Sequence, residues 1–247
     1  MTNLGKISTQ LNTTSAGQYP KCKINDMHYK LGNYTPLKFI NRENIVEVIG
    51  SKISQELNIN TIKYSLCDVT AEINNRTYKT IAVQSKHLKD FTTFGKIIDI
   101  RLDVLEQLHK IFTKEDISKM IAIDSIMEQK DRHINNIGLN TDKQLILFDY
   151  GRALLHDTED FLLYKWQEYD FVGRTYYKDF GIRVDDIIEK ILYIDLTKLD
   201  ITSIVRQTKE EYAKCEYKQG YIIEDRYFYE IENMLKRGVE LYEQKWH

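Results

Sequence analysis

The chain has 247 residues, of which 42% are hydrophobic and 29% are charged, and its formal net charge at pH 7 is -2. This composition predicts a globular protein of one large domain or two lobes. It gives no reason to expect nucleic acid or an anionic membrane as a partner, and no apolar run reaches the length of a membrane span. Three scattered cysteines, Cys22, Cys67 and Cys215, indicate neither a disulfide framework nor a zinc site, so we expect a cytoplasmic protein with reduced thiols.

The N-terminal part begins with a polar stretch and continues with a predicted hairpin and helix. Residues 1–20 are rich in Ser and Thr, which is typical of a mobile tail. Lys21–Leu31 predicts a β-hairpin, with Asn25 and Asp26 in its turn. A helix is expected over about Asn41–Leu57, because apolar residues recur there at helical spacing.

Two further strands should complete a small antiparallel sheet that carries this helix. They are expected over Ile62–Ile73 and Thr77–Gln84, since apolar and β-branched residues dominate both segments. We therefore predict an N-terminal lobe over residues 1–88. The segment Ser85–Phe94 would cross to the second lobe.

Helical patterns prevail from Ile97 onward, so residues 89–247 should form an α-rich second lobe. The predicted helices cover about Arg101–Phe112, Lys114–Gln129, Val184–Tyr193, Ile201–Lys214 and Tyr221–Lys245. The pattern Thr113-x-x-Asp116 resembles a capping box at a helix start. The aromatic-rich segment 152–181 would be an activation-loop equivalent, a substrate platform or helical packing of this lobe. The predicted fold class is therefore α+β.

The segment Lys130–Gly151 carries the residues on which the functional prediction depends. Asp131 is followed five residues later by Asn136, and Asp149 follows a short apolar run. Protein kinases use one Asp to accept the proton of the substrate hydroxyl, an Asn to bind Mg²⁺, and a second Asp to hold the metal against the nucleotide phosphates. Two short strands joined by a turn at residues 140–143 would bring Asn136 and Asp149 near one metal ion.

These residues also carry a resemblance to a known family. Asp131-Arg132-His133-x-x-Asn136, followed by Phe148-Asp149-Tyr150-Gly151, resembles the HipA-like kinases, and the first run is also similar to phosphatidylinositol kinases. The resemblance implies a two-lobed protein-kinase-like fold with ATP and Mg²⁺ as cofactors. Asp131 would be the catalytic base, His133 would stand where ordinary kinases place a catalytic-loop lysine, and Asn136 and Asp149 would bind the metal. Apart from the resemblance, the same residues would suit an ordinary surface loop between two strands.

The resemblance extends into the N-terminal half. Ser15-Ala16-Gly17-Gln18-Tyr19-Pro20-Lys21 is similar to the Ser-Gly-x-Gln-x-Lys loop that replaces a Gly-rich phosphate loop in this family, which implies nucleotide contacts at Ser15 and Gly17. Lys30 would grip the nucleotide phosphates. Glu43 and Glu47 both lie on the predicted helix within reach of such a lysine, and alignment with the family favours Glu47 as its partner. Solvated surface charges are the plainer interpretation.

The resemblance also has departures. Gln129 stands where family members usually have Asn, two residues before the catalytic Asp. The chain leaves no room for the accessory N-terminal subdomain of the larger family members. No basic or amphipathic stretch suited to a membrane surface is evident, so a lipid substrate is not favoured.

Taken together, the resemblance implies an ATP-dependent kinase that acts on Ser or Thr hydroxyls of a protein substrate. Such kinases are often toxins of bacterial toxin–antitoxin modules, so an antitoxin is a candidate partner. The alternative is a degenerate kinase fold that serves as a nucleotide-sensing or protein-binding module. The family also suggests a switch, in which autophosphorylation within Thr13–Ser15, with Ser15 the best candidate, would eject the phosphate loop.

Overall fold

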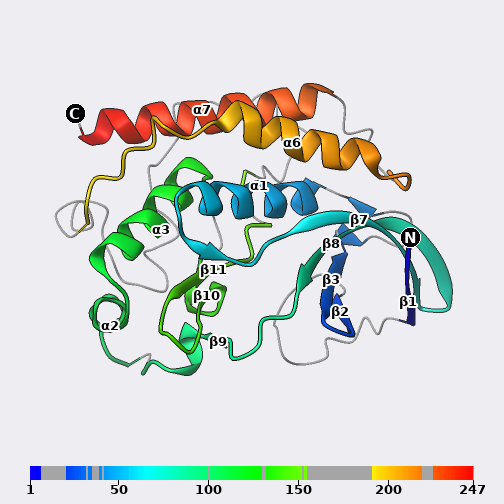
Figure 1. Cartoon of the computed structure of the whole chain (residues 1–247), viewed down its shortest axis with the longest axis horizontal. Coiled ribbons are helices and arrows are strands. Elements are labelled where there is room, and N and C mark those ends of the chain that lie inside the picture. The colour runs from blue at the N-terminus through cyan, green and yellow to red at the C-terminus, as the bar shows by residue number, and fades with distance from the viewer. Residues whose placement is uncertain are drawn as a thin grey trace.

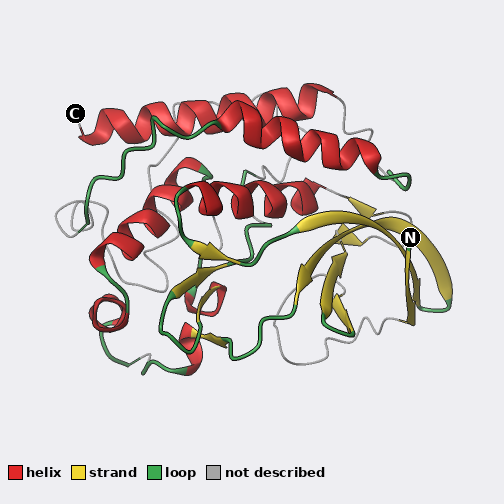
Figure 2. Ribbon diagram, in the orientation of Figure 1, coloured by secondary structure: helices red, strands yellow, loops and turns green. Residues whose placement is uncertain are grey.

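A curved sheet followed by a set of helices makes up the described part of the protein (Figures 1 and 2). The computed structural model describes residues 1–6, 21–31, 33–34, 39–40, 42–99, 101–129, 132–151, 153–154, 191–218 and 225–246. The sheet belongs to the N-terminal part, and long helices form the C-terminal part, which confirms the predicted α+β class.

The larger sheet has five strands in the order β1-β7-β8-β3-β2. These are β1 (Thr2–Lys6), β2 (Lys21–Ile24), β3 (Met27–Leu31), β7 (Ser65–Ile73) and β8 (Arg76–Lys86). Both predicted hairpins are confirmed, since β2 pairs with β3 and β7 with β8 in antiparallel fashion. Asn25, Asn74 and Asn75 occupy the two turns with positive φ angles, a conformation that Asn tolerates better than most residues.

Strand β1 corrects the prediction of a polar tail for the first residues of the chain. Thr2–Lys6 lies parallel to β7, and Leu4 is buried in a small apolar cluster on the outer face of the sheet. Pairing at a sheet edge uses backbone groups and needs only one apolar side chain here, so the polar sequence did not reveal it. Residues 7–20, which include the predicted phosphate loop, lie outside the described residues.

Helix α1 (Arg42–Glu56) confirms the predicted helix, but it is buried on more than one face. It contacts β7 and β8 on one side and α6 (Ile201–Lys214) on the other, so it lies within the main hydrophobic core (Figure 1). Its buried polar residues are Glu43, Asn44, Glu47, Ser51 and Ser54. Asn44, for example, donates its side-chain amide to the carbonyl of Ile81 on β8.

A second, four-stranded sheet of short strands has the order β6-β11-β10-β9. Its members are β6 (Asn60–Thr61), β9 (Thr92–Thr93), β10 (Ile137–Leu139) and β11 (Leu145–Leu147). The antiparallel β10–β11 pair confirms the two short strands predicted around the kinase-like motif. A two-stranded ribbon, β4 (Asn33–Tyr34) with β5 (Phe39–Ile40), and two 3-10 turns, η1 (Phe94–Lys96) and η2 (Ile134–Asn136), complete the non-helical elements.

The remaining described helices are α2 (Val104–Ile111), α3 (Lys114–Ile126), α6 and α7 (Asp225–Trp246). Thr113 caps α3 as predicted, because its hydroxyl oxygen accepts from the backbone N–H of Asp116 at 3.1 Å. The last predicted residues of the helix over 184–193 are not helical at 191–193, and its other residues lie outside the described ranges, as does nearly all of the aromatic-rich segment. Among the described helices, none is both long enough and apolar enough to cross a bilayer.

One large core unites the elements that carry the motif. It joins α1, the small sheet and the helices α2, α3, α6 and α7, while a second, smaller cluster covers the outer face of the five-stranded sheet. Because the larger core contains residues from both sides of residue 88, the two predicted lobes share it. The division of the chain at residue 88 stays a prediction.

Candidate functional site

Three charged residues that are far apart in the sequence meet at one point. Lys30 on β3 forms ion pairs with Glu47 on α1 and with Asp149, which follows β11. The distance between Lys30 Nζ and Asp149 Oδ1 is 2.7 Å. The side chain of Glu47 is fully buried and that of Lys30 is 12% exposed, so water screens these ion pairs only weakly. The structure therefore brings together three of the predicted site residues.

Local sequence patterns explain how these side chains reach one place. Tyr29 and Leu31 belong to the outer apolar cluster, so the alternation of a strand directs Lys30 to the opposite face of the sheet. Glu47 uses both of its carboxylate oxygens, because Oε1 pairs with Lys30 and Oε2 accepts from the backbone N–H of Tyr150 at 2.7 Å. Asp149 has a φ of 59°, a left-handed conformation that reorients the chain directly after β11.

Burial and the neighbouring charges together determine the pKa values of Lys30, Asp149 and Glu47. Burial acts to lower the pKa of Lys30, but Glu47 and then Asp149 raise it above its ordinary value. Burial acts to raise the pKa of Asp149, yet Lys30 and Lys21 bring it well below its usual range. Burial raises the pKa of Glu47, while Lys30 and the N–H of Tyr150 favour its ionised form. At neutral pH, Lys30 is thus a cation and Asp149 an anion, which suits a phosphate and a divalent metal respectively.

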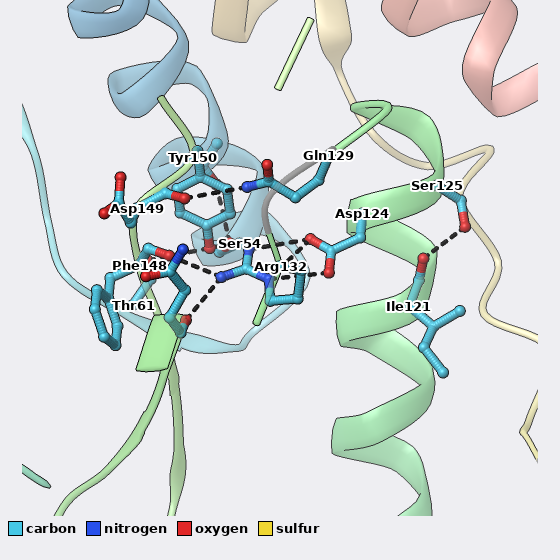
Figure 3. A network of polar contacts seen from close by, with 12 residues as sticks. Ser54, Thr61, Ile121, Asp124, Ser125, Gln129, Arg132, Phe148, Asp149 and Tyr150 are labelled. Carbon is cyan, nitrogen blue, oxygen red and sulfur yellow. Dashed lines mark hydrogen bonds and ion pairs between the residues drawn. The ribbon is translucent and has the colours of Figure 1, made fainter. Parts of the chain in front are cut away.

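A buried arginine, Arg132, organises the backbone at Asn136 and beside Asp149, and Figure 3 shows it between Asp124 and Phe148. Arg132 is 1% exposed, and its guanidinium makes a bidentate ion pair with Asp124 of α3, with Nε–Oδ2 and Nη2–Oδ1 distances of 3.0 Å. Its Nη1 donates to the carbonyl oxygens of Asn136 and Phe148, both at 2.7 Å. One side chain therefore joins the start of β10 to the end of β11, where the two predicted metal ligands lie.

Tyr150 attaches the same segment to α1. Its ring is completely buried, and its hydroxyl lies 2.6 Å from the hydroxyl oxygen of Ser54. The guanidinium of Arg132 lies 5.1 Å from the centre of the ring, within the range of a cation–π contact. The ring also packs so closely on Gly50 that a Cβ atom at that position would overlap it. The helix that carries Glu47 and the segment that carries Asp149 are thus in direct contact.

Gln129 stands at the position where HipA-like kinases usually have Asn. Its side-chain amide donates to the backbone carbonyl of Asp149 at 3.1 Å, and the residue is buried (Figure 3). A side chain longer than Asn therefore still holds the backbone of the predicted metal-binding aspartate.

Of the other predicted site residues, the structure describes His133 and Asn136. The Nδ1 atom of His133 accepts from the backbone N–H of Asn135 at 3.1 Å, which caps η2, and Asn136 is buried at the end of that turn. Asp131, Ser15 and Gly17 lie outside the described residues. Their roles as catalytic base and phosphate loop stay predictions.

The donor set at the site suits Mg²⁺ that arrives with a nucleotide. Across the described ranges, no group of three or more His, Cys, Asp or Glu side chains is arranged to hold a metal ion. Mg²⁺ commonly takes one or two protein oxygens and completes its shell with phosphate oxygens and water. Arg132 fixes the backbone at Asn136 and beside Asp149. Metal binding by the side chains of these two residues stays a prediction.

Lys21, the last residue of the predicted phosphate-loop motif, lies opposite Lys30 across the β2–β3 pair, and the two-residue turn at Asn25 and Asp26 fixes that register. Sequence reasoning gave no role to two other residues of this site. Asp124 and Arg132 pair across different elements. No local pattern could have identified their ion pair.

Comparisons with known proteins give a structural likeness only. No protein-family model and no curated protein matches this chain in sequence. Among solved structures, the chain is similar to the crystal structure of a Helicobacter pylori proinflammatory kinase, CtkA, with a TM-score of 0.49 and 14% identity over 96% of each chain.

Proposed function

We propose that this protein is an ATP- and Mg²⁺-dependent phosphotransferase that acts on Ser or Thr hydroxyls of a protein. The observation that carries the proposal is the ion-pair cluster of Lys30 with Glu47 and Asp149. In kinases, a strand lysine paired with a helix glutamate binds the nucleotide phosphates, and the aspartate of an Asp-x-Gly motif holds the metal. The present chain supplies these residues from a strand, a helix and an Asp-Tyr-Gly segment.

Each residue then has a stated task in phosphoryl transfer. Lys30 would bind phosphate oxygens of ATP, and Glu47 would orient it. Asn136 and Asp149 would hold Mg²⁺, which neutralises charge on the transferred group. The hydroxyl oxygen of the substrate would form a bond to the γ-phosphorus while the bond between that phosphorus and the β–γ bridging oxygen breaks. The hydroxyl proton would pass to Asp131, which leaves ADP and a phosphate ester as products.

The resemblance of the Asp131–Asn136 run to HipA-like kinases supports a protein substrate, and it makes an antitoxin a candidate partner. The phosphorylated residue type is open to direct measurement. Purified protein would be incubated with γ-labelled ATP, Mg²⁺ and total cell protein, and the labelled products would be hydrolysed for phosphoamino-acid analysis. We expect phosphoserine or phosphothreonine, and label found solely in lipid would contradict the proposed substrate class.

The test of the active-site assignment compares two lysine variants in that assay. Lys30→Met should lower transfer by roughly two to three orders of magnitude, as the removal of a preorganised charged donor does elsewhere. Lys23→Met is the matched control, since Lys23 is exposed on the neighbouring strand and should leave transfer unchanged. Equal transfer by the Lys30→Met variant and the wild type would remove the basis of the proposal. Tight ATP binding by a wild type without any transfer would favour the nucleotide-sensing alternative.

A further inference from the structure

Two histidines that are 59 residues apart in the sequence have their rings in direct contact. The Nε2 atom of His28 lies 2.8 Å from the Nδ1 atom of His87. The ring centroids are 5.0 Å apart, and the ring planes are inclined by 41°. His28 belongs to β3, and His87 directly follows the last residue of β8. A ring nitrogen of each side chain is therefore turned toward the other ring.

The backbone on both sides of this pair is fixed by hydrogen bonds. Strands β3 and β8 are antiparallel neighbours, and His28 is the partner of Ser85 in their register. The backbone N–H of His87 donates to the carbonyl oxygen of Asp26, in the turn before β3, at 2.6 Å. The contact between the two rings thus follows from the pairing of the sheet, and the side chains alone need to move when the pair binds a ligand.

The surroundings of His28 favour its neutral form. Partial burial lowers its pKa, and His87 and then Lys23, which lies opposite His28 on β2, act in the same direction. In a neutral pair, one facing nitrogen carries a proton and the other carries a lone pair, so one ring donates a hydrogen bond to the other. His28 is exposed and His87 is half-buried, so an ion in solution has access to both nitrogens.

The spacing of the two nitrogens suits a particular class of metal ion. Neutral imidazole is the commonest metal ligand in proteins. Two nitrogens that are 2.8 Å apart and each lie about 2.0–2.1 Å from one ion subtend roughly a right angle at that ion. The same two ligands of a tetrahedral zinc ion would be about 3.3 Å apart. Right angles between nitrogen ligands are typical of square-planar sites, which Cu²⁺ and Ni²⁺ prefer.

We propose that His28 and His87 form a binding site for a divalent transition-metal ion of the Cu²⁺ or Ni²⁺ class, with the two facing nitrogens as ligands and water in the remaining positions. The ion would replace the hydrogen bond between the rings. The ring that donates this bond would move its proton to its other nitrogen, and both rings would turn their facing lone pairs toward the ion, so the neutral pair releases no proton.

This site is separate from the Mg²⁺ site predicted at Asn136 and Asp149. Imidazole nitrogens suit Cu²⁺ and Ni²⁺, whereas Mg²⁺ takes oxygen ligands. A bound ion would link β3 to the segment that follows β8. The inference does not depend on the proposed function, because it would hold for a protein without phosphotransferase activity.

The test uses the full-length chain without a histidine tag and three variants, His28→Gln, His87→Gln and His109→Gln. His109 is the matched control because it is an exposed histidine on a different element, α2. The affinity for Ni²⁺ is measured by calorimetry in excess Mg²⁺, which occupies oxygen sites. The number of imidazole nitrogens bound to Cu²⁺ is measured by electron paramagnetic resonance, and circular dichroism checks that each variant is folded.

We expect His28→Gln and His87→Gln each to weaken Ni²⁺ binding roughly a hundredfold, because a single ligand loses the advantage that two linked ligands have over one. The Cu²⁺ spectrum should show two coordinated imidazole nitrogens in the wild type and one fewer in either variant. His109→Gln should bind both ions as the wild type does. Lys23→Met should strengthen Ni²⁺ binding, since it removes a positive charge opposite His28.

Several outcomes would overturn the inference. A wild type that binds neither Ni²⁺ nor Cu²⁺ would show that the pair is a hydrogen bond and nothing more. Wild-type affinity in His28→Gln, or an equal loss in His109→Gln, would place the bound ion elsewhere on the chain. A Cu²⁺ spectrum with a single imidazole nitrogen in the wild type would show that the two rings do not bind one ion together.

Discussion

At the scale of single residues, Arg132 links several segments of the candidate site. It neutralises Asp124 and donates to two backbone carbonyls beside the predicted metal ligands. A lysine could keep the charge but could not reproduce this planar set of donors. The backbone geometry at Asn136 and beside Asp149 therefore depends on a buried guanidinium.

Removal of Arg132 should be strongly destabilising, because it leaves the carboxylate of Asp124 buried without its partner. We expect Arg132→Met to lower the free energy of unfolding by about 3–5 kcal/mol, measured by urea denaturation. Adding Asp124→Leu should recover part of this loss, since the uncompensated charge is then gone. Arg101→Met is the control, because the ion pair of Arg101 with Asp99 lies at the surface, and it should change little. Equal effects at positions 132 and 101 would contradict the structural role of Arg132.

Asp149 should make the stability of the protein depend on pH in a defined direction. Its folded-state pKa lies below the ordinary value of 3.8, so the ionised form stabilises the fold above about pH 4. This contribution is lost as the pH falls through the folded-state pKa. The stability difference between wild type and Asp149→Asn should thus be constant from pH 5 to 7 and shrink below about pH 4. In a Lys30→Met background, which removes the main cause of the shift, the pH dependence should be much weaker; an unchanged dependence would contradict the assignment.

At the scale of elements, α1 is the part that connects the sheet to the motif. Glu47 joins it to β3 and to the backbone of Tyr150, Ser54 joins it to the Tyr150 hydroxyl, and Lys52 forms an ion pair with Glu211 of α6 at 2.7 Å. Contacts from three other elements therefore fix the position of Glu47.

The contact of α1 with Tyr150 can be tested at Gly50. Alanine favours a helix interior over glycine by about 1 kcal/mol, so propensity alone predicts that Gly50→Ala stabilises the protein. The Tyr150 ring occupies the space of the new methyl group, and overpacking of this kind costs roughly 1–3 kcal/mol, so we expect a net loss of stability. In a Tyr150→Leu background, the same substitution should cost less or be favourable. Thermal unfolding of the four proteins gives the coupling, and strictly additive effects would rule out the contact.

At the scale of the whole molecule, the C-terminal helices close over the N-terminal elements. Besides the Lys52–Glu211 ion pair, Asp68 of β7 accepts from the backbone N–H groups of Glu216 and Tyr217, just beyond α6, at 2.9–3.1 Å. Figure 1 shows α6 and α7 side by side above α1. The sheet and its helix thus share one core with the last part of the chain.

A fragment of residues 1–88 should therefore not fold by itself. Without α3 and α6, it would expose the face of α1 that lies in the main core, including Ile45, Ile49 and Ile53, which are fully buried in the whole protein. The loss of this burial removes the dominant favourable contribution to folding. We expect the fragment to show no cooperative thermal transition by circular dichroism, and the full chain to show one. A cooperative transition in the fragment would establish residues 1–88 as an independent domain.

The sequence by itself determined the elements whose signals are local. The hairpin at Lys21–Leu31, helix α1, the β7–β8 hairpin and helix α6 follow from periodicity and from turn-forming Asn and Asp residues, which act within a few neighbouring residues. Spacing and resemblance also selected Lys30, Glu47, Asn136 and Asp149 as candidates.

Only the tertiary structure decided which charges meet. It paired Lys30 with Glu47 rather than with Glu43, joined Arg132 to Asp124, and placed β1 beside β7. Such pairings depend on how distant elements pack and on how far each charge is removed from water. Those quantities arise once the core has formed, and no short stretch of the sequence encodes them.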